Sequence, residues 1–195
     1  MSMLKSLAAA LALFAGLALE AAGAMAQTGG YSWTYGLGSP ATPQDLAAFD
    51  GLSGQPDGRG LPAGKGTYEQ GKTVYAERCA ACHGGKLEGL PKPGPGGDKL
   101  IGARGTLATD TPVKTVESFW PYASTLFDYV KRAMPFNAPG TLGNDEVYAV
   151  MAYILAEAKI VPAGAVMDKN SVGKVEMPNR NGFVPDPRPE IELYR

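Results

Sequence analysis

Two cysteines and a histidine stand within one five-residue stretch, Cys79-Ala80-Ala81-Cys82-His83, and the chain has no other residue of either type. C-x-x-C-H is the attachment signature of c-type haem. On one short helical turn, two thiols with this spacing can add to the two vinyl groups of a haem edge, and the next residue is held beneath the iron. The spacing therefore predicts one covalently attached haem c, bound through Cys79 and Cys82, with His83 as an axial ligand of the iron.

Three other uses of a C-x-x-C pair fit this chain less well. A zinc site would need two further ligands besides the cysteines, and the chain offers a single histidine. A thioredoxin-like redox pair requires a βαβ context, which the sequence lacks. A disulfide between the two cysteines would close too small a loop to stabilise much. Haem attachment is therefore the preferred interpretation.

The second axial ligand must come from another residue type, because His83 is the only histidine; it is a methionine, a lysine or absent. Met134 directly precedes Pro135, at the predicted end of a helix, and a loop over residues 137–140 follows. A loop that proline makes rigid can fold over the second face of the haem. We therefore expect Met134 to be the other axial ligand. The remaining methionines of the predicted mature chain fall in a helical stripe or in a Pro-rich tail: Met151, Met167 and Met177.

The predicted pair of axial ligands bears on function. His/Met ligation raises the reduction potential of a haem and suits electron transfer. An iron closed in this way also argues against substrate chemistry at the haem. The sequence thus favours an electron carrier, with a haem enzyme or gas sensor as the alternative if the sixth position is open.

Three predicted helices can position these ligands. Residues 68–82 have helical spacing and run into the haem motif, residues 122–134 carry an apolar stripe and stop at a proline, and residues 144–159 form the last helix. Gly71 in mid-helix costs about 1 kcal/mol relative to alanine. Such a cost is tolerated where a second helix approaches closely, so we expect Gly71 and Tyr75 to pack against the last helix.

Several side chains between these helices are candidates for contact with the haem. Trp120 and Tyr122 carry hydrogen-bond donors that can reach haem propionates, although aromatic packing in the core explains them equally well. The Gly/Pro-rich residues 84–105 follow His83 and can supply the backbone carbonyl that its other ring nitrogen needs. The apolar candidates in this segment are Leu100 and Ile101.

The first 26 residues have the features of a targeting segment. Residues 1–5 are a short basic region, residues 7–19 are apolar, and Ala24-Met25-Ala26 is a small-x-small cleavage site, so the mature chain should begin at Gln27. The apolar run is too short to span a membrane comfortably. We therefore expect cleavage after Ala26, export to the periplasm and no membrane anchor.

The mature chain is expected to be one all-α domain between two irregular extensions. Residues 27–66 would form an extended N-terminal arm, residues 67–160 the helical domain and residues 161–195 an extended C-terminal tail. The formal net charge of -1 implies no polyanionic partner such as a nucleic acid.

The order of haem helix, loop, middle helix, Met-Pro loop and C-terminal helix resembles the class I cytochrome c fold over about residues 68–159. Gly71 and Tyr75 stand where the helix-crossing residues of that family stand, and residues 148–153 match the opposing helix. The resemblance implies an all-α cytochrome c domain.

A narrower resemblance covers most of the mature chain. Four segments look like the cytochrome subunits of bacterial sulfite and sulfane dehydrogenases: residues 35–43, 119–129, 132–136 and 177–183. In that family the cytochrome takes electrons from a molybdenum-cofactor subunit that oxidises a sulfur substrate. The resemblance implies such a partner, catalysis on the partner rather than on this chain, and haem ligation by the four residues named above: Cys79, Cys82, His83 and Met134.

The function expected from this resemblance is that of a mono-haem electron-transfer subunit in sulfur oxidation, which would pass single electrons to a soluble cytochrome c. Some sulfane-dehydrogenase cytochromes carry two haems, whereas this chain has one C-x-x-C-H motif. Extended Pro-rich segments can wrap a partner at low ordering cost, so the two extensions favour a subunit. The alternative is a free-standing periplasmic electron carrier, which would need only about residues 66–159.

Overall fold

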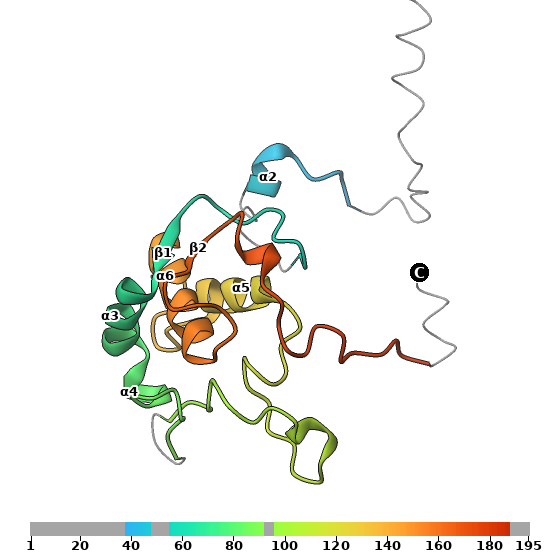
Figure 1. Ribbon diagram of the computed structural model, residues 1–195. Coiled ribbons are helices and arrows are strands. Elements are labelled where there is room, and N and C mark those ends of the chain that lie inside the picture. The colour runs from blue at the N-terminus through green and yellow to red at the C-terminus, as the bar shows by residue number, and fades with distance from the viewer. Residues whose placement is uncertain (1–37, 48–54, 92–95, 188–195) are drawn as a thin grey trace, which may run out of the picture. The chain divides into compact units, whose positions relative to one another are not determined.

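The computed structural model describes residues 38–47, 55–91 and 96–187 (Figure 1). The chain divides into two units, residues 1–41 and 42–195, and the described residues of the first unit are exposed and irregular. The predicted signal peptide lies outside the described residues. The elements of the second unit are α2 (Pro43–Ala47), β1 (Lys65–Thr67), α3 (Tyr68–Arg78), α4 (Ala80–His83), η1 (Thr106–Ala108), α5 (Ala123–Ala133), α6 (Asn144–Glu157), β2 (Val166–Asp168) and η2 (Val172–Lys174). Among the described helices, none is long and apolar enough to cross a membrane.

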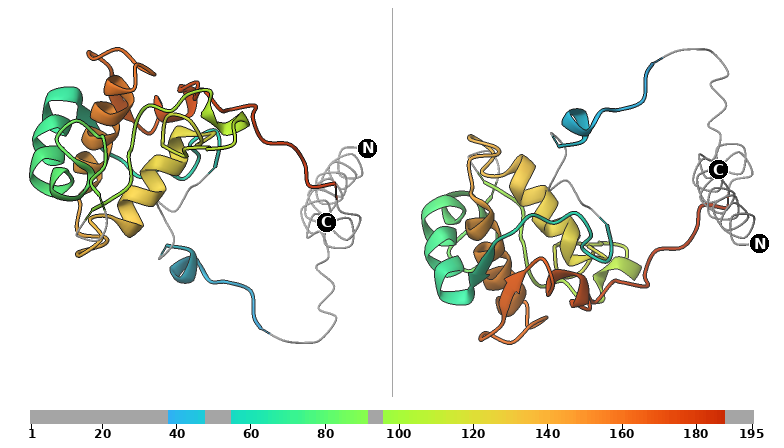
Figure 2. Two further views of the ribbon diagram at one scale, coloured as in Figure 1. Left: turned by 90° about the horizontal axis from the view of Figure 1, so that it is seen from below. Right: turned by 90° about the horizontal axis from the view of Figure 1, so that it is seen from above.

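Helices α3 and α6 cross at two small residues and lie against each other in every view (Figure 1 and Figure 2). A Cβ atom on Gly71 of α3 would lie 1.8 Å from the carbonyl oxygen of Ala149 on α6, so only glycine allows this approach. Beside the crossing, the ring centroids of Tyr75 and Tyr153 are 5.1 Å apart. The predicted packing of Gly71 and Tyr75 against the last helix is confirmed.

The predicted helix over residues 68–82 is wrong in one respect, because the helix breaks at Cys79. The backbone of Cys79 has φ -126° and ψ -37°. Its N–H donates to the carbonyl of Tyr75 and closes α3, while its carbonyl accepts from the N–H of His83 and opens α4, both at 2.9 Å. The haem motif therefore forms a short helix of its own.

Helix α6 is the centre of the core. Residues 147–155 are buried on every side of the helix, because α3, α5, β1 and β2 all pack around it. The strongest contact with α5 is aromatic, with ring centroids of Phe127 and Tyr148 4.7 Å apart. The observed α5 and α6 lie within the predicted ranges 122–134 and 144–159 and end one or two residues inside them.

Strands β1 and β2 form a small antiparallel sheet in which Gly66 lies opposite Met167. A Cβ atom on Gly66 would stand 2.0 Å from the backbone nitrogen of Ala149, so β1 presses directly on α6. The hydroxyl of Tyr148 also donates to the carbonyl of Pro62 over 2.8 Å. The end of the predicted N-terminal arm is therefore part of the packed domain.

Residues 161–183 fold back onto the domain. Four of their side chains are buried: Met167, Val172, Val175 and Met177. Farther along, the amide of Asn179 donates to the carbonyl of Phe119 over 2.7 Å, and the ring of Phe183 meets that of Phe119 edge to face. The predicted domain limit at residue 160 thus falls inside the packed core. These apolar residues recur with neither helical nor strand period, which is why the sequence suggested a tail.

Candidate haem site

The two cysteines stand on one turn of chain at the break between α3 and α4. The N–H of Cys82 donates to the carbonyl of Cys79 over 3.1 Å, and both thiols are free and half-buried. Burial, and to a smaller extent the neighbouring Cys82, raises the pKa of the Cys79 thiol to about 11. The two cysteines are not joined in a disulfide, and the unpaired thiol is the form that thioether formation requires.

The imidazole of His83 is held from one side by the loop that follows it. Its Nδ1 lies 2.7 Å from the carbonyl oxygen of Asp98. A carbonyl oxygen can only accept, so Nδ1 carries the proton and Nε2 keeps a lone pair that is free for a metal. The backbone carbonyl of Asp98 is thus the acceptor that the sequence could not single out, and Asp98 lies just after the prolines of the loop.

The same loop is fastened to α3 and to the haem motif. The hydroxyl of Tyr75 donates to the carbonyl of Gly84 over 2.7 Å in a buried setting, and burial raises the pKa of this hydroxyl above its usual range. The N–H of Gly97 donates to the carbonyl of Cys82, also over 2.7 Å. These bonds fix the backbone that presents the Asp98 carbonyl to His83.

Met134 follows the last residue of α5 and is half-buried against the core. Its N–H donates to the carbonyl of Val130 over 3.2 Å, which fixes the point where the helix ends. Trp120 is also half-buried, with its ring 5.5 Å from that of Tyr129 in an edge-to-face contact, and Tyr122 directly precedes α5. The contact with Tyr129 gives Trp120 a packing role, and its predicted propionate contact stays a prediction.

The residues present suit a haem. Two reduced thiols and an oriented imidazole lie on one short turn, and a thioether stands at the end of a separate helix. Several apolar side chains at the border of the core remain half-exposed, as the walls of a cleft for a flat apolar cofactor would be: Cys79, Leu100, Ile101, Trp120 and Met134. This donor set is soft sulfur and imidazole nitrogen, the set that His/Met haem iron takes.

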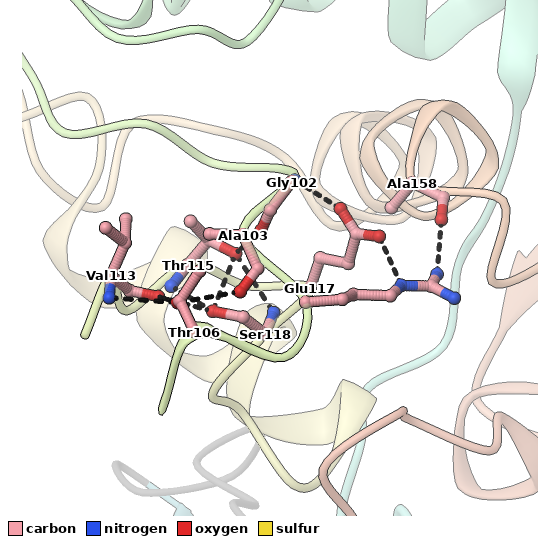
Figure 3. Close-up of polar contacts among 9 residues, drawn as sticks. Gly102, Ala103, Thr106, Val113, Thr115, Glu117, Ser118 and Ala158 are labelled. Carbon is pink, nitrogen blue, oxygen red and sulfur yellow. Dashed lines mark hydrogen bonds and ion pairs between the residues drawn. The ribbon is translucent and has the colours of Figure 1, made fainter. Parts of the chain in front are cut away.

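Sequence reasoning missed a partly buried ionic contact that holds the loop carrying Leu100 and Ile101 (Figure 3). The side chain of Glu117 is 10% exposed; it pairs with Arg104 and accepts from the N–H of Gly102. Arg104 in turn donates to the carbonyl of Ala158, just after α6, over 2.7 Å. One glutamate therefore ties the loop to the end of the central helix. The signal in the sequence was a single acid in a segment otherwise free of charge, Thr115-Val116-Glu117-Ser118-Phe119.

A second set of bonds closes the neighbouring turn (Figure 3). The hydroxyl of Thr115 donates to the carbonyl of Gly102 over 2.9 Å, and the hydroxyl of Ser118 donates to the carbonyl of Val113 over 2.8 Å. The hydroxyl of Thr106 accepts from the N–H of Val113 over 3.1 Å. These side chains make residues 102–118 a rigid segment beside the predicted haem contacts.

Comparison with known proteins agrees with this geometry. Residues 68–157 match the cytochrome c family. A search of curated proteins found no match. Among solved structures, the chain is similar to one in the crystal structure of the sulfane dehydrogenase SoxCD from Paracoccus pantotrophus, with 39% identity, a TM-score of 0.70, and coverage of 82% of this chain and 76% of that chain.

These findings define the class of protein as a class I c-type cytochrome, with a mostly helical fold and little sheet. The chain belongs to the cytochrome c family. It is accordingly an electron-transfer protein rather than an enzyme, and its cofactor is covalently bound haem c.

Proposed function

We propose that this chain is the mono-haem electron-transfer subunit of a periplasmic, molybdenum-dependent sulfite or sulfane dehydrogenase. Cys79 and Cys82 would form the thioethers to the haem, and His83 and Met134 would bind its iron. The bound cofactor supplies a centre that takes up and gives up one electron at a time. The chain's own residues attach it, orient its ligands and cover it.

The observation that carries the proposal is the contact of His83 Nδ1 with the Asp98 carbonyl at 2.7 Å, beside two reduced cysteines. It leaves Nε2 as the metal-binding nitrogen and makes the imidazole a more basic ligand. Trp120 and Tyr122 are proposed to direct their donors to the propionates. The thiols and Nε2 of His83 are committed to holding the haem, so we assign the oxidation to a partner.

The likeness to SoxCD, at 39% identity over 82% of this chain, supports the choice of a sulfane dehydrogenase. The sequence resemblance described above adds a molybdenum-cofactor subunit as electron donor and a soluble cytochrome c as acceptor. The targeting features of residues 1–26 support export to the periplasm, where c-type haem is attached.

The fold shows which part of the C-terminal extension packs against the chain's own core. Residues 161–183 are engaged with the chain's own core, through Met177, Asn179 and Phe183 among others. A truncation after residue 161 would therefore test folding. Val184, which is 85% exposed, is the first residue after these contacts, so a truncation that tests partner binding should begin there.

The test uses the full-length chain from an extract of its own host, fractionated by size-exclusion and ion-exchange chromatography. Haem-containing fractions are assayed for molybdenum, then mixed with sulfite or with thiosulfate while the haem absorbance is followed. We expect haem and molybdenum to migrate together, and one of the two sulfur compounds to reduce the haem. A chain lacking residues 184–195 should keep its haem and lose the molybdenum, whereas Lys169→Ala, an exposed control in the same extension, should keep both.

The contrary result is a haem protein that migrates as a monomer without molybdenum and is reduced by neither sulfur compound. That result would favour a free-standing periplasmic electron carrier, because the domain packs its core with residues of this chain.

A further inference from the structure

The loop that carries the proposed ligand Met134 is held mainly at its two ends. We call residues 134–142 the methionine loop. Met134 at its start is half-buried, and Leu142 at its end is 2% exposed. Between them the chain faces outward, and the ring of Phe136 is 85% exposed. A loop of this kind can open locally unless its ends are tied together.

The bonds inside the methionine loop shape it without joining its ends. The N–H of Ala138 donates to the carbonyl of Pro135 over 2.9 Å. The hydroxyl of Thr141 donates to the carbonyl of Ala138 over 2.8 Å. Each of these bonds spans three residues, so neither links Met134 to Leu142.

Lys131 connects the two ends of the methionine loop. It lies three residues before Met134 in the last turn of α5, and its Nζ donates to the carbonyl of Leu142 over 2.6 Å in a half-buried position. The ammonium thus bonds the end of the methionine loop to the helix from which the loop starts. A charged donor at this distance forms one of the stronger protein hydrogen bonds.

Capping of α6 does not explain why the Lys131 ammonium bonds the carbonyl of Leu142. Leu142 lies just before the N-terminus of α6, the positive end of the helix dipole, which disfavours a cation. The N-terminus of α6 is capped without Lys131, since the carboxylate of Glu146 accepts from the N–H of Gly143 over 2.7 Å. What the Lys131 bond does achieve is closure of the methionine loop.

We propose that Lys131 is a positioning residue that clamps the methionine loop shut and so keeps Met134 on the haem iron. The proposal rests on the axial role of Met134 in the proposed function. Arg132, the next residue, is the matched control: it is exposed and pairs with Asp128 one turn back on α5, so it ties nothing across the loop.

The test titrates the oxidised, haem-loaded full-length protein with imidazole, which binds ferric iron only when Met134 leaves it. Lys131→Met keeps the apolar stem and removes the ammonium; Lys131→Gln is a second variant with a polar end too short to bridge. We expect imidazole affinity to rise roughly tenfold or more in both, in line with the loss of one charged hydrogen bond. Arg132→Gln should match the wild type. Urea unfolding of each variant is followed in parallel.

Unchanged imidazole affinity in both Lys131 variants, with or without a loss in urea stability, would overturn the clamp and leave the proposed ligation standing. A wild-type protein without the red charge-transfer band of methionine-bound ferric haem would overturn the ligation itself, and the clamp with it.

Discussion

Gly97 lies against the imidazole of His83, so that a Cβ atom on residue 97 would stand 2.6 Å from Cε1 of the ring. The close contact holds the ring from the side while the Asp98 carbonyl holds Nδ1. Once the ring is bound to iron it cannot swing away, so the space at residue 97 must stay empty.

Replacing Gly97 with alanine should therefore disturb the proximal ligand. We expect a cost of about 2 kcal/mol in unfolding free energy, as for other overpacked sites. The reduction potential should rise, because an imidazole with a weaker bond to Asp98 is a less basic ligand and stabilises ferric iron less. Urea unfolding and a redox titration measure the two effects. Gly85→Ala is the control, since nothing lies within 4 Å of its added Cβ; equal behaviour of the two variants would contradict the contact.

The crossing of α3 and α6 should be equally intolerant of a methyl group. A Cβ on Gly71 would collide with the backbone carbonyl of Ala149 at 1.8 Å, and a backbone atom cannot move aside as a side chain can. We expect Gly71→Ala to lower the unfolding free energy by about 3 kcal/mol or more. Thr73→Ala, at an exposed position of the same helix, should be neutral or slightly stabilising. A small effect at Gly71 would mean that the helices do not cross here.

Removing Glu117 should lower the stability of the protein more than removing Arg132, the basic partner of the other ion pair described above (Figure 3). Glu117→Ala leaves the N–H of Gly102 without its acceptor and the Arg104 guanidinium without its carboxylate partner, so we expect a loss of about 2 kcal/mol in unfolding free energy. The pair of Arg132 and Asp128 lies within one turn of α5 and holds no loop, so Arg132→Gln should change the free energy by about 0.5 kcal/mol or less. Urea unfolding compares the two. Equal losses would show that Glu117 does not tie the loop to the end of α6.

Buried tyrosines predict a loss of stability in alkaline solution. Burial raises the pKa of Tyr148 to about 12 and also raises that of Tyr153, whereas an unfolded tyrosine titrates near 10. Because the folded state resists forming tyrosinate, their contribution is complete below about pH 10 and is lost as the pH rises toward 12. Urea unfolding at a series of pH values should show this fall. Tyr148→Phe should make the fall shallower by one proton; an unchanged slope would contradict the assignment.

The helices and the haem motif could be predicted because their signals are local. The spacing of Cys79, Cys82 and His83 is enough to predict haem attachment. The end of the helix before Pro135 and the start of the helix at Asn144 are set by neighbouring residues. Gly71 was informative because glycine destabilises the middle of a helix, so its presence there indicated close packing against another helix. The bounds of α5 and α6 follow from the same local rules.

What the sequence did not reveal depends on contacts between distant residues. Met177 is buried because residues 161–183 fold back, and Asn179 reaches Phe119 across 60 positions of sequence. The roles of Asp98 and Glu117 likewise come from a backbone carbonyl and a loop N–H that carry no residue-type signal. The break at Cys79 lies in a stretch whose helical spacing continues from Tyr75 through Arg78 to Cys82.

The central claim is that one haem is attached at Cys79 and Cys82 and ligated by His83 and Met134, and the absorption spectrum of the oxidised protein tests it most directly. The mass of the wild type should show one haem per chain, and its spectrum should contain the red charge-transfer band of a methionine–ferric iron bond. That band should vanish in Met134→Ala and persist in Met151→Leu, a volume-conserving change in the core. A Met134→Ala protein with the wild-type spectrum would contradict the account.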